Sequence, residues 1–377
     1  MLELKKEKDT GALICNERPT MMWLESTSRC NLRCITCYRT YLPFFKGKDL
    51  DSEVFEIVKM EFFPYLKEAF IQVYGEPMIA ANFEYIFEEA KKYNMDVMFV
   101  TNGMFLTERW LRKLLKYGIR FGISLDGARA ETMQKIRRGA DFKRIINSVK
   151  RFNELKVSEY KESKARIFMI CVAMRSNIEE LPELILLAKS LNISEVCIQL
   201  FTLSIHPLTL WKESLRYYKK LANKYLMLAK EKAEQLGVEL KVSLYGFNEK
   251  GGARGPFSPR GSSYRFPQKC SVPWEGILVR TNGDVTPCCC SGEIMGNIKK
   301  DGFWDIWNGP QYREFRSRIN TNLPPLDCIN CIYEVGINAG NPENTKQSEN
   351  LTHKILYFFE RNRRLLKNIY CYLKDYL

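Results

Sequence analysis

The sequence predicts an α/β fold built on parallel strands, and two patterns carry this prediction. Between residues 20 and 201, six segments with strand character alternate with amphipathic helices roughly every 25 residues, which is typical of parallel strands joined by crossover helices. Continuously apolar strands, such as residues 167–173, are usually buried on both faces of a sheet. Periodicity alone does not separate an open sheet from a barrel.

The expected elements follow in order along the first two-thirds of the chain. Strands are expected at 20–25, 69–74, 96–100, 119–125, 166–173 and 195–201. Helices are expected at 51–67, 82–93, 107–117, 141–155 and 178–191. Asn82 and Thr107 are expected to cap helices, and Gly118 is expected to end one. A long helical stretch at 211–236 and a further strand at 238–244 follow.

With 377 residues, of which 45% are apolar, the chain is long enough for one large and one small domain. Changes in composition predict five parts: an N-terminal extension (1–19), a core domain (20–245), a linker rich in glycine and proline (246–269), a small cysteine-rich domain (270–345) and a basic amphipathic helix (346–377). The last helix is expected either to dock on the core domain or to contact a membrane surface through residues 350–377.

Composition also narrows the partners and the location. The net charge is +14, but the basic residues are interleaved with acids and no helix-turn-helix, zinc-finger or RNP pattern is present, so we expect no nucleic acid partner. No apolar run approaches the ~18 residues of a membrane span. Thirteen cysteines, with a charged N-terminus that lacks the apolar segment of a signal peptide, predict metal ligands in a cytoplasmic protein.

Three cysteines follow the first expected strand in the spacing C-x3-C-x2-C: Cys30, Cys34 and Cys37. Thiolates select zinc, copper(I) or iron–sulfur clusters. Structural zinc sites and iron–sulfur clusters ordinarily take four protein ligands, and the two histidines, His206 and His353, are far away in the sequence. Three thiolates would leave one metal position open, and metal chemistry occurs at open positions.

This stretch resembles the signature of the radical S-adenosylmethionine (SAM) enzymes. The resemblance implies that Cys30, Cys34 and Cys37 hold a [4Fe–4S] cluster, that SAM chelates the fourth iron through its amino and carboxylate groups, and that Tyr38 lies near the adenine. It also implies a partial (β/α)6 TIM-like barrel with the cysteine loop after the first strand. The alternative is a chance group of cysteines or a zinc site.

Further residues at strand ends match this family in order. Gly75-Glu76-Pro77 follows the second expected strand, where the resemblance implies that the segment binds the SAM amino group. Glycine lets the backbone approach closely, and barrel ligands bind at the C-terminal ends of strands. Residue 74 is a tyrosine where relatives often have glycine. Asn102 follows the third expected strand, and the resemblance implies a place near the SAM ribose.

The fourth expected strand ends at Ser124, and an arginine pair follows. By resemblance, Ser124 and Arg137 hold the SAM carboxylate, a role that suits arginine because its fork can bind a carboxylate through two hydrogen bonds. The adjacent Arg138 is an alternative for this role, and Asp126 is compatible with a turn role alone.

A second cysteine-rich region begins at Cys270. Asn282-Gly283-Asp284 lies between apolar segments there and predicts a hairpin. Four cysteines could close around a cluster with no open position: Cys270, Cys288, Cys328 and Cys331. By contrast, Cys171 and Cys197 lie in apolar strands, and with Cys15 they are expected to be packing residues.

The second region resembles the SPASM extension of radical SAM enzymes, which implies a small C-terminal cysteine-rich SPASM-like domain. Position 337 is an isoleucine where a two-cluster SPASM domain continues with further cysteines, so we expect one auxiliary [4Fe–4S] cluster. A zinc-ribbon-like site is the alternative, and Cys289 or Cys290 could substitute for Cys288.

The motifs together predict a radical SAM/SPASM enzyme. Such an enzyme would cleave SAM reductively to a 5′-deoxyadenosyl radical, with electrons from a low-potential donor such as flavodoxin or ferredoxin. The radical would abstract hydrogen from a peptide or small-molecule substrate. No catalytic acid or base is identified. The alternatives are a non-enzymatic iron–sulfur or zinc sensor and a membrane-surface adaptor.

Overall fold

A computed structural model describes residues 11–41, 47–201, 208–242 and 270–321, together with Pro324, Pro325, Asp327 and Cys328. Three expectations lie outside these residues: the linker at 246–269, the C-terminal helix at 346–377 with its membrane contact, and the position of Cys331. No described helix is long and apolar enough to span a membrane.

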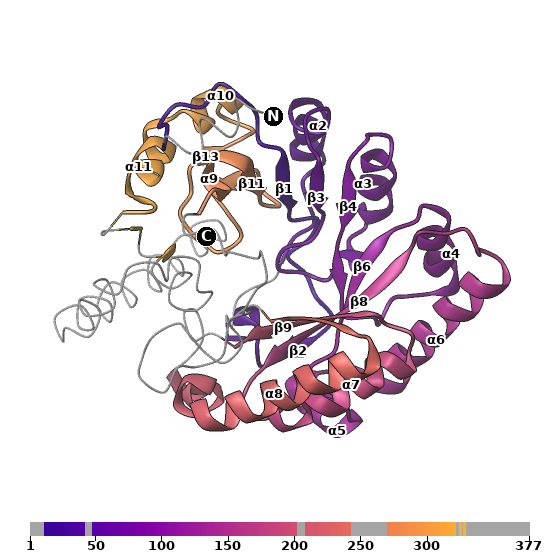
Figure 1. Cartoon of the computed structure of the whole chain (residues 1–377). Helices are drawn as coiled ribbons and strands as arrows, with labels where there is room; N and C mark the ends of the chain where they lie inside the picture. Colours follow the sequence, from indigo (N-terminus) through magenta and orange to yellow (C-terminus); the bar gives the residue numbers. More distant parts are fainter. Residues whose placement is uncertain are drawn as a thin grey trace.

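A curved, mostly parallel array of strands, divided into a six-stranded and a five-stranded sheet, runs through the protein (Figure 1). Its parallel strands are β1 (Met21–Leu24), β3 (Glu68–Phe70), β4 (Asp96–Met98), β5 (Val100–Thr101), β6 (Arg120–Ser124), β8 (Arg166–Ala173), β9 (Glu195–Leu200) and β10 (Glu239–Val242). The six strands expected between residues 20 and 201 therefore occur in the expected order. The α/β prediction with parallel strands is confirmed, and the curved open sheet agrees with a partial barrel.

The third expected strand is divided into two at Phe99. β4 pairs with β3, whereas β5 pairs with β6, so the two halves belong to different sheets. The carbonyl of Met98 accepts the Ile71 amide at 3.0 Å, and the carbonyl of Phe99 accepts the Gly122 amide at 2.9 Å. This single segment therefore joins the two sheets and carries the curvature from one to the other.

The helices line the outer side of this sheet (Figure 1). They are α2 (Ser52–Glu61), α3 (Phe83–Ala90), α4 (Glu108–Lys116), α5 (Ala130–Ile136), α6 (Phe142–Ser158), α7 (Leu181–Ser190) and α8 (Lys219–Leu236). Their apolar residues recur at helical spacing and are buried, as with Leu111, Leu114 and Leu115 of α4. Gly118 ends this helix with a φ of 67°, as expected.

Several local expectations are wrong. The first helix ends at Glu61 rather than residue 67, and α5 was not expected. The helices expected at 178–191 and 211–236 begin instead as separate 3-10 turns: η3 (Ile178–Glu180), η4 (Leu208–Glu213) and η5 (Leu215–Tyr217). Asn82 and Thr107 stand at N-cap positions without a capping bond; the Asn82 amide instead donates to the Leu50 carbonyl at 2.9 Å.

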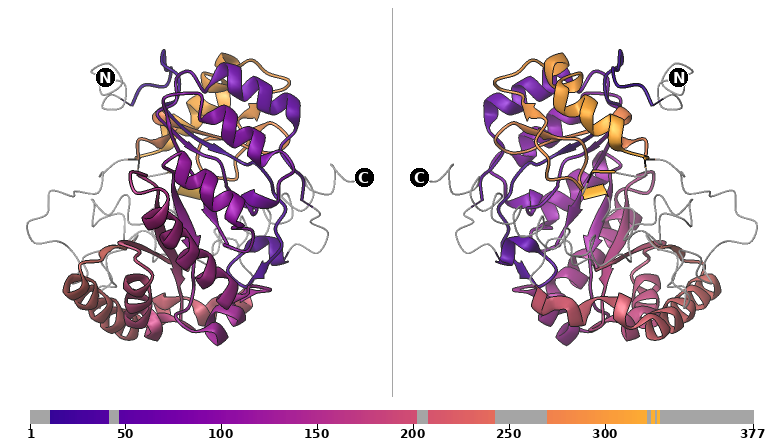
Figure 2. Two further views of the ribbon diagram at one scale, coloured as in Figure 1. Left: turned by 90° about the vertical axis from the view of Figure 1, so that its right-hand side faces the viewer. Right: turned by 90° about the vertical axis from the view of Figure 1, so that its left-hand side faces the viewer.

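The cysteine-rich region extends the same sheet. β11 (Gly276–Val279) runs parallel to β1 on the edge opposite β3, with Leu24 opposite Val279. β12 (Asp284–Thr286) returns antiparallel, and Gly283 forms the expected turn with a φ of 88°. The remaining elements are α9 (Val272–Glu275), β13 (Gly296–Asn297), α10 (Phe303–Trp307) and α11 (Pro310–Arg318). Figure 2 shows that this region lies at the α2 end of the molecule, opposite α8.

Residues 11–18, here called the N-terminal strap, lie across this cysteine-rich region. Asn308 receives the Cys15 amide at 2.8 Å and donates to the Cys15 carbonyl at 2.9 Å. Three further side chains donate to strap carbonyls: Trp274 to Ala12 at 2.6 Å, Arg316 to Leu13 at 3.1 Å and Trp307 to Glu17 at 3.0 Å. The strap thus fastens to residues about 260 to 300 positions away in the sequence.

Candidate cluster and SAM site

The loops after β1, β3, β5 and β6 meet at one edge of the sheet, because parallel strands direct their C-terminal ends the same way. The loop after β1 carries Cys30, Cys34 and Cys37. The loop after β3 touches it directly, since the Glu76 amide donates to the Arg29 carbonyl at 2.8 Å. The sequence-predicted residues from four separate segments are therefore brought to one place.

A short two-stranded ladder fixes the cysteine loop. β2 (Arg33–Cys34) pairs antiparallel with β7 (Arg137–Arg138), which places Cys34 opposite Arg137. The Ile35 amide also donates to the Ile136 carbonyl at 2.9 Å. Tyr38 directly follows Cys37 and begins η1 (Tyr38–Tyr41); its side chain lies outside the described part of the structure.

The cysteine thiols of this loop are free and largely shielded from solvent. Burial raises the pKa of Cys34 to about 11 and also raises the pKa of Cys30, and the charge of Cys37 adds to both shifts. Among the described residues, no three Cys, His, Asp or Glu side chains converge on a point that would hold a single metal ion. A [4Fe–4S] cluster makes a different demand, because each thiolate binds its own iron and the cations favour the thiolates.

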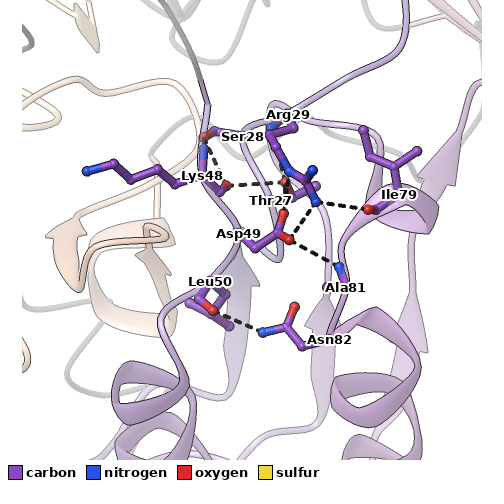
Figure 3. A network of polar contacts seen from close by, with 9 residues as sticks. All are labelled: Thr27, Ser28, Arg29, Lys48, Asp49, Leu50, Ile79, Ala81 and Asn82. Atoms are coloured by element: carbon purple, nitrogen blue, oxygen red, sulfur yellow. Dashed lines mark hydrogen bonds and ion pairs between the residues drawn. The ribbon is translucent and has the colours of Figure 1, made fainter.

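A polar network anchors the residue before the first cysteine (Figure 3). The guanidinium of Arg29 binds both oxygens of Asp49, at 2.8 and 2.6 Å, and donates to the Ile79 carbonyl at 3.1 Å. The Asp49 carboxylate also accepts the Thr27 hydroxyl at 2.7 Å and the Ala81 amide at 3.1 Å. Asp49 therefore ties the start of the cysteine loop to the segment that follows Gly75-Glu76-Pro77.

Gly75 sits where the loop after β3 presses on the cysteine loop. A Cβ at this position would lie 2.2 Å from the Thr27 carbonyl oxygen and 2.5 Å from that of Arg29, distances that no side chain tolerates. Glycine is therefore required by close approach of two backbones, which is the reason proposed from the sequence.

The Glu76 side chain points into the protein. Its carboxylate accepts the Thr101 hydroxyl at 2.6 Å and the Asn102 amide at 2.7 Å. Burial raises the pKa of Glu76 to about 7, although these hydrogen bonds act in the opposite direction. The carboxylate is thus engaged by the end of β5.

Asn102 lies beside the first cysteine. Its side-chain nitrogen Nδ2 donates to the side-chain oxygen of Asn31 at 2.8 Å and lies 3.8 Å from the Cys30 sulfur. Its own side-chain oxygen accepts the Met104 amide at 3.0 Å. The ribose contact implied for Asn102 stays a prediction, and its side-chain amide nitrogen contacts the cysteine loop.

Arg137 and Asp126 form a buried ion pair next to Cys34. The Arg137 Nε and Asp126 Oδ2 atoms lie 2.7 Å apart, and the other Asp126 oxygen accepts the Val172 amide at 2.7 Å. Burial would lower the pKa of Arg137, but the Asp126 carboxylate raises it, so the charge is retained. Arg138 is exposed, which favours Arg137 as the inward-facing residue of the pair. Ser124 is also buried, at the end of β6.

The second group of cysteines also comes together. Burial raises the pKa of Cys270 to about 11 and also raises the pKa of Cys328. The charges of Cys288 and Cys270 add to the shift at Cys328, so the three cysteines are neighbours. Cys290 is exposed, and its charge raises the pKa of both Cys270 and Cys288. Its sulfur lies 3.9 Å from the sulfur of Cys289. Cys331 lies outside the described residues, so the expected fourth ligand stays a prediction.

Two residues that the sequence did not single out hold this second group in place. Asn320 exchanges two hydrogen bonds with the backbone of Cys270, at 2.7 and 3.0 Å. Asp327 accepts the Ser291 hydroxyl at 3.1 Å and the Gly292 amide at 2.8 Å, which ties Cys328 to the chain after Cys290. Asn320 has a φ of 67°, a left-handed conformation that asparagine tolerates better than most residues. Its partner could not be predicted, because no spacing in the sequence connects Asn320 with Cys270.

Comparison with known proteins agrees with this arrangement. Residues 24–188 match the radical SAM superfamily, and residues 270–332 match the SPASM iron–sulfur cluster-binding domain. The chain therefore belongs to the radical SAM superfamily of enzymes and carries a SPASM domain. The first domain binds a [4Fe–4S] cluster with SAM, and the second is an auxiliary iron–sulfur domain.

Two relatives are similar over most of their length. The tungsten-containing aldehyde ferredoxin oxidoreductase cofactor-modifying protein of Pyrococcus furiosus is 24% identical over 335 residues, which cover 82% of this chain and 86% of the relative. The AdoMet-dependent heme synthase of Methanosarcina barkeri is 24% identical over 328 residues, which cover 79% and 85%.

Solved structures share the fold. Streptococcus suis SuiB bound to its precursor peptide SuiA superposes with a TM-score of 0.61 at 15% identity, covering 90% of this chain and 73% of SuiB. The enzyme anSMEcpe with bound AdoMet gives a TM-score of 0.60 at 18% identity, covering 93% of this chain and 95% of anSMEcpe.

Proposed function

We propose that the protein cleaves SAM at a cluster held by Cys30, Cys34 and Cys37 and directs the resulting hydrogen abstraction at a peptide or small-molecule substrate. When bound, the cluster and SAM supply the electron and the 5′-deoxyadenosyl radical for this reaction. The observation that carries the proposal is the meeting of four strand-end loops around the three cysteines, with the contacts between the loops after β1, β3 and β5 made directly.

Each protein group has a definite task in this proposal. The ladder between Cys34 and Arg137 fixes the cysteine loop against the arginine that would bind the SAM carboxylate. Asp126 holds the Nε side of that guanidinium, so the remainder of the fork is oriented before SAM binds. Gly75 lets the backbone of the next loop come close enough for its carbonyls to reach the SAM amino group.

The substrate class rests on similarity. SuiB was solved with the precursor peptide SuiA, and anSMEcpe with the Cp18Cys peptide, which supports a peptide substrate. The heme synthase and the cofactor-modifying protein support a small molecule. Because both classes are represented among these similar proteins, the proposal keeps a peptide or a small molecule as the substrate.

The proposal also includes one auxiliary cluster, a low-potential electron donor and a cytoplasmic location. Cys270, Cys288, Cys328 and Cys331 would close the auxiliary cluster, which would then transfer electrons or stabilise the domain rather than bind substrate. A donor such as flavodoxin or ferredoxin would reduce the first cluster. The cytoplasmic location rests on the sequence, because cysteines clustered at the spacing of metal ligands are typical of a reducing compartment.

The test is formation of 5′-deoxyadenosine by the anaerobically reconstituted, reduced protein supplied with SAM. We expect the wild-type chain to form it and Cys34→Ala to abolish it. Cys197→Ala is the matched control, because Cys197 lies in β9 with its sulfur 3.6 Å from Glu195, and its loss should leave the reaction intact. If the wild-type protein binds iron but forms no 5′-deoxyadenosine, the non-enzymatic sensor becomes the better explanation.

A further inference from the structure

Helix α11 lies directly against the chain that begins at Cys270. The Arg316 side chain on this helix donates through Nε to the Pro273 carbonyl at 3.0 Å. Beyond the end of the helix, Asn320 holds the backbone of Cys270 through two hydrogen bonds. The side chains on this face of α11 therefore border the auxiliary cysteine group.

Tyr312, one turn before Arg316 on the same face, is completely buried. Its ring packs edge-on against Trp307, with ring centroids 4.8 Å apart, and the Arg316 guanidinium lies over it at 4.7 Å from the centroid. These contacts account for the ring but leave the hydroxyl unexplained. The Tyr312 oxygen has no hydrogen-bond partner among the residues that the structure describes.

A buried hydroxyl without a partner destabilises a folded protein, so native structures almost always supply an acceptor. The causes of the raised Tyr312 pKa indicate which groups surround its hydroxyl. Burial raises this pKa, the Arg316 cation lowers it, and the charges of Cys288 and Cys15 raise it further. Neither sulfur is bonded to the hydroxyl in the described structure. An acceptor bound at Cys288 would complete this site.

We propose that the Tyr312 hydroxyl donates a hydrogen bond to the auxiliary iron–sulfur cluster at its Cys288 corner, to the thiolate or an adjacent sulfide. A donor at this position stabilises the more negative, reduced form of the cluster and so raises its midpoint potential. Tyr312 acts as a positioning and tuning residue for this cluster. The inference depends on the SPASM domain binding its cluster and is independent of SAM cleavage.

The test uses the full-length chain in which Cys30, Cys34 and Cys37 are replaced by alanine, so that only the auxiliary cluster remains. Anaerobic redox titration followed by electron paramagnetic resonance gives its midpoint potential. We expect Tyr312→Phe in this background to shift the potential to a more negative value. Tyr225→Phe is the matched control, because the Tyr225 hydroxyl lies on α8, where it donates to Glu179 at 3.4 Å, and its removal should leave the potential unchanged.

A second measurement separates this role from simple packing. In the cluster-free protein, Tyr312→Phe removes an unpaired hydroxyl and should leave thermal stability equal or higher. In the cluster-loaded protein, the same substitution should speed release of iron to a chelator several-fold. An unchanged potential, an equal effect on loaded and cluster-free protein, or a lack of iron in the background variant would overturn the proposal. This test remains decisive even if the wild-type protein forms no 5′-deoxyadenosine.

Discussion

At the residue scale, the carboxylate of Glu76 connects two of the loops that form the site. Its oxygens bind the Thr101 hydroxyl and the Asn102 amide at the end of β5, and Asn102 in turn lies beside Cys30. One buried side chain therefore connects the loop after β3 to the first cysteine. A family motif alone does not distinguish the role of this carboxylate from that of the backbone around it.

The raised pKa of Glu76 predicts a pH effect on the stability of the cluster-free protein. The folded pKa is about 7, above the ordinary 4.5, so the folded state binds more protons than the unfolded state between these values. The free energy of unfolding should therefore fall as the pH rises from 4.5 to 7, by up to about 3 kcal/mol.

Glu76→Gln should remove this part of the pH dependence, because the amide does not titrate there. Urea denaturation at several pH values measures it, with Glu68→Gln on the exposed side of β3 as the control. A slope that persists unchanged in Glu76→Gln would show that another group titrates.

At the element scale, the site depends on how closely the loops after β1 and β3 approach. Asp49 supports this contact from below, since it binds Arg29 and the Ala81 amide together (Figure 3). Neither local sequence nor helix propensity determines the distance between two such loops. It follows from the pairing of β1 with β3, which brings their ends side by side.

Gly75→Ala should disrupt the site more than the fold. The new methyl group would meet two backbone oxygens that cannot move aside independently, so the loops must separate. We expect reconstituted Gly75→Ala to hold less iron at the first cluster and to lose SAM binding, as measured by iron content and equilibrium dialysis.

Gly237→Ala is the control for this prediction. Gly237 has a φ of 63° at the end of α8, with open space around its Cα, so alanine there costs about 1 kcal/mol of backbone strain without a collision. SAM binding equal in the two variants would contradict the role assigned to the close approach.

The sequence was informative wherever the signal is local. Apolar runs predict the strands, Asn282-Gly283 predicts the hairpin, and Gly118 predicts a helix end, all of which the structure confirms. Asn82 fails as a capping residue because a tertiary acceptor, the Leu50 carbonyl, takes its side chain. The division of the third strand at Phe99 could not be predicted either, because hydrophobic periodicity does not indicate which neighbouring strand each half will pair with.

The same difference between local signals and tertiary contacts applies to the candidate site. Cysteine spacing and strand-end motifs predict which residues meet, and the structure brings these segments together. Asp49, Asp126 and Asn320 were missed as supporting residues because their partners lie 20, 11 and 50 positions away with no recurring spacing. Their contribution depends on the completed fold, and a single sequence contains no direct record of it.

At the scale of the whole molecule, the N-terminal strap, the sheet and the SPASM domain form one assembly. The parallel pairing of β11 with β1 places the two cysteine-bearing regions on the same sheet. Arg18 of the strap lies over the Phe303 ring of α10, at 4.6 Å from its centroid, and binds Glu61 of α2 at 2.8 Å. The strap therefore links the SPASM domain to the radical SAM domain.

Asn308→Ala should destabilise the protein by loosening this strap. It removes both hydrogen bonds to the Cys15 backbone, each worth about 1 kcal/mol, so we expect the free energy of unfolding to fall by about 2 kcal/mol in urea denaturation. Asn153→Ala, which loses one bond to the Leu191 carbonyl, should cost about half as much.

Truncation identifies the cause. In a chain lacking residues 1–18, Asn308→Ala has no strap to release and should cost little, because effects that share one contact do not add. A full additional loss in the truncated chain would assign Asn308 to some other interaction.

The central claim is that the chain holds one SAM-binding cluster at Cys30, Cys34 and Cys37 and a second, separate cluster in the SPASM domain. Iron analysis of the anaerobically reconstituted protein, combined with the 5′-deoxyadenosine assay, tests it most directly. We expect about eight irons per chain, and replacement of Cys30, Cys34 and Cys37 by alanine should leave about four and abolish 5′-deoxyadenosine formation. About four irons in the wild-type chain, with a zinc ion retained, would contradict the auxiliary cluster. Unchanged 5′-deoxyadenosine formation in the triple variant would contradict the SAM site.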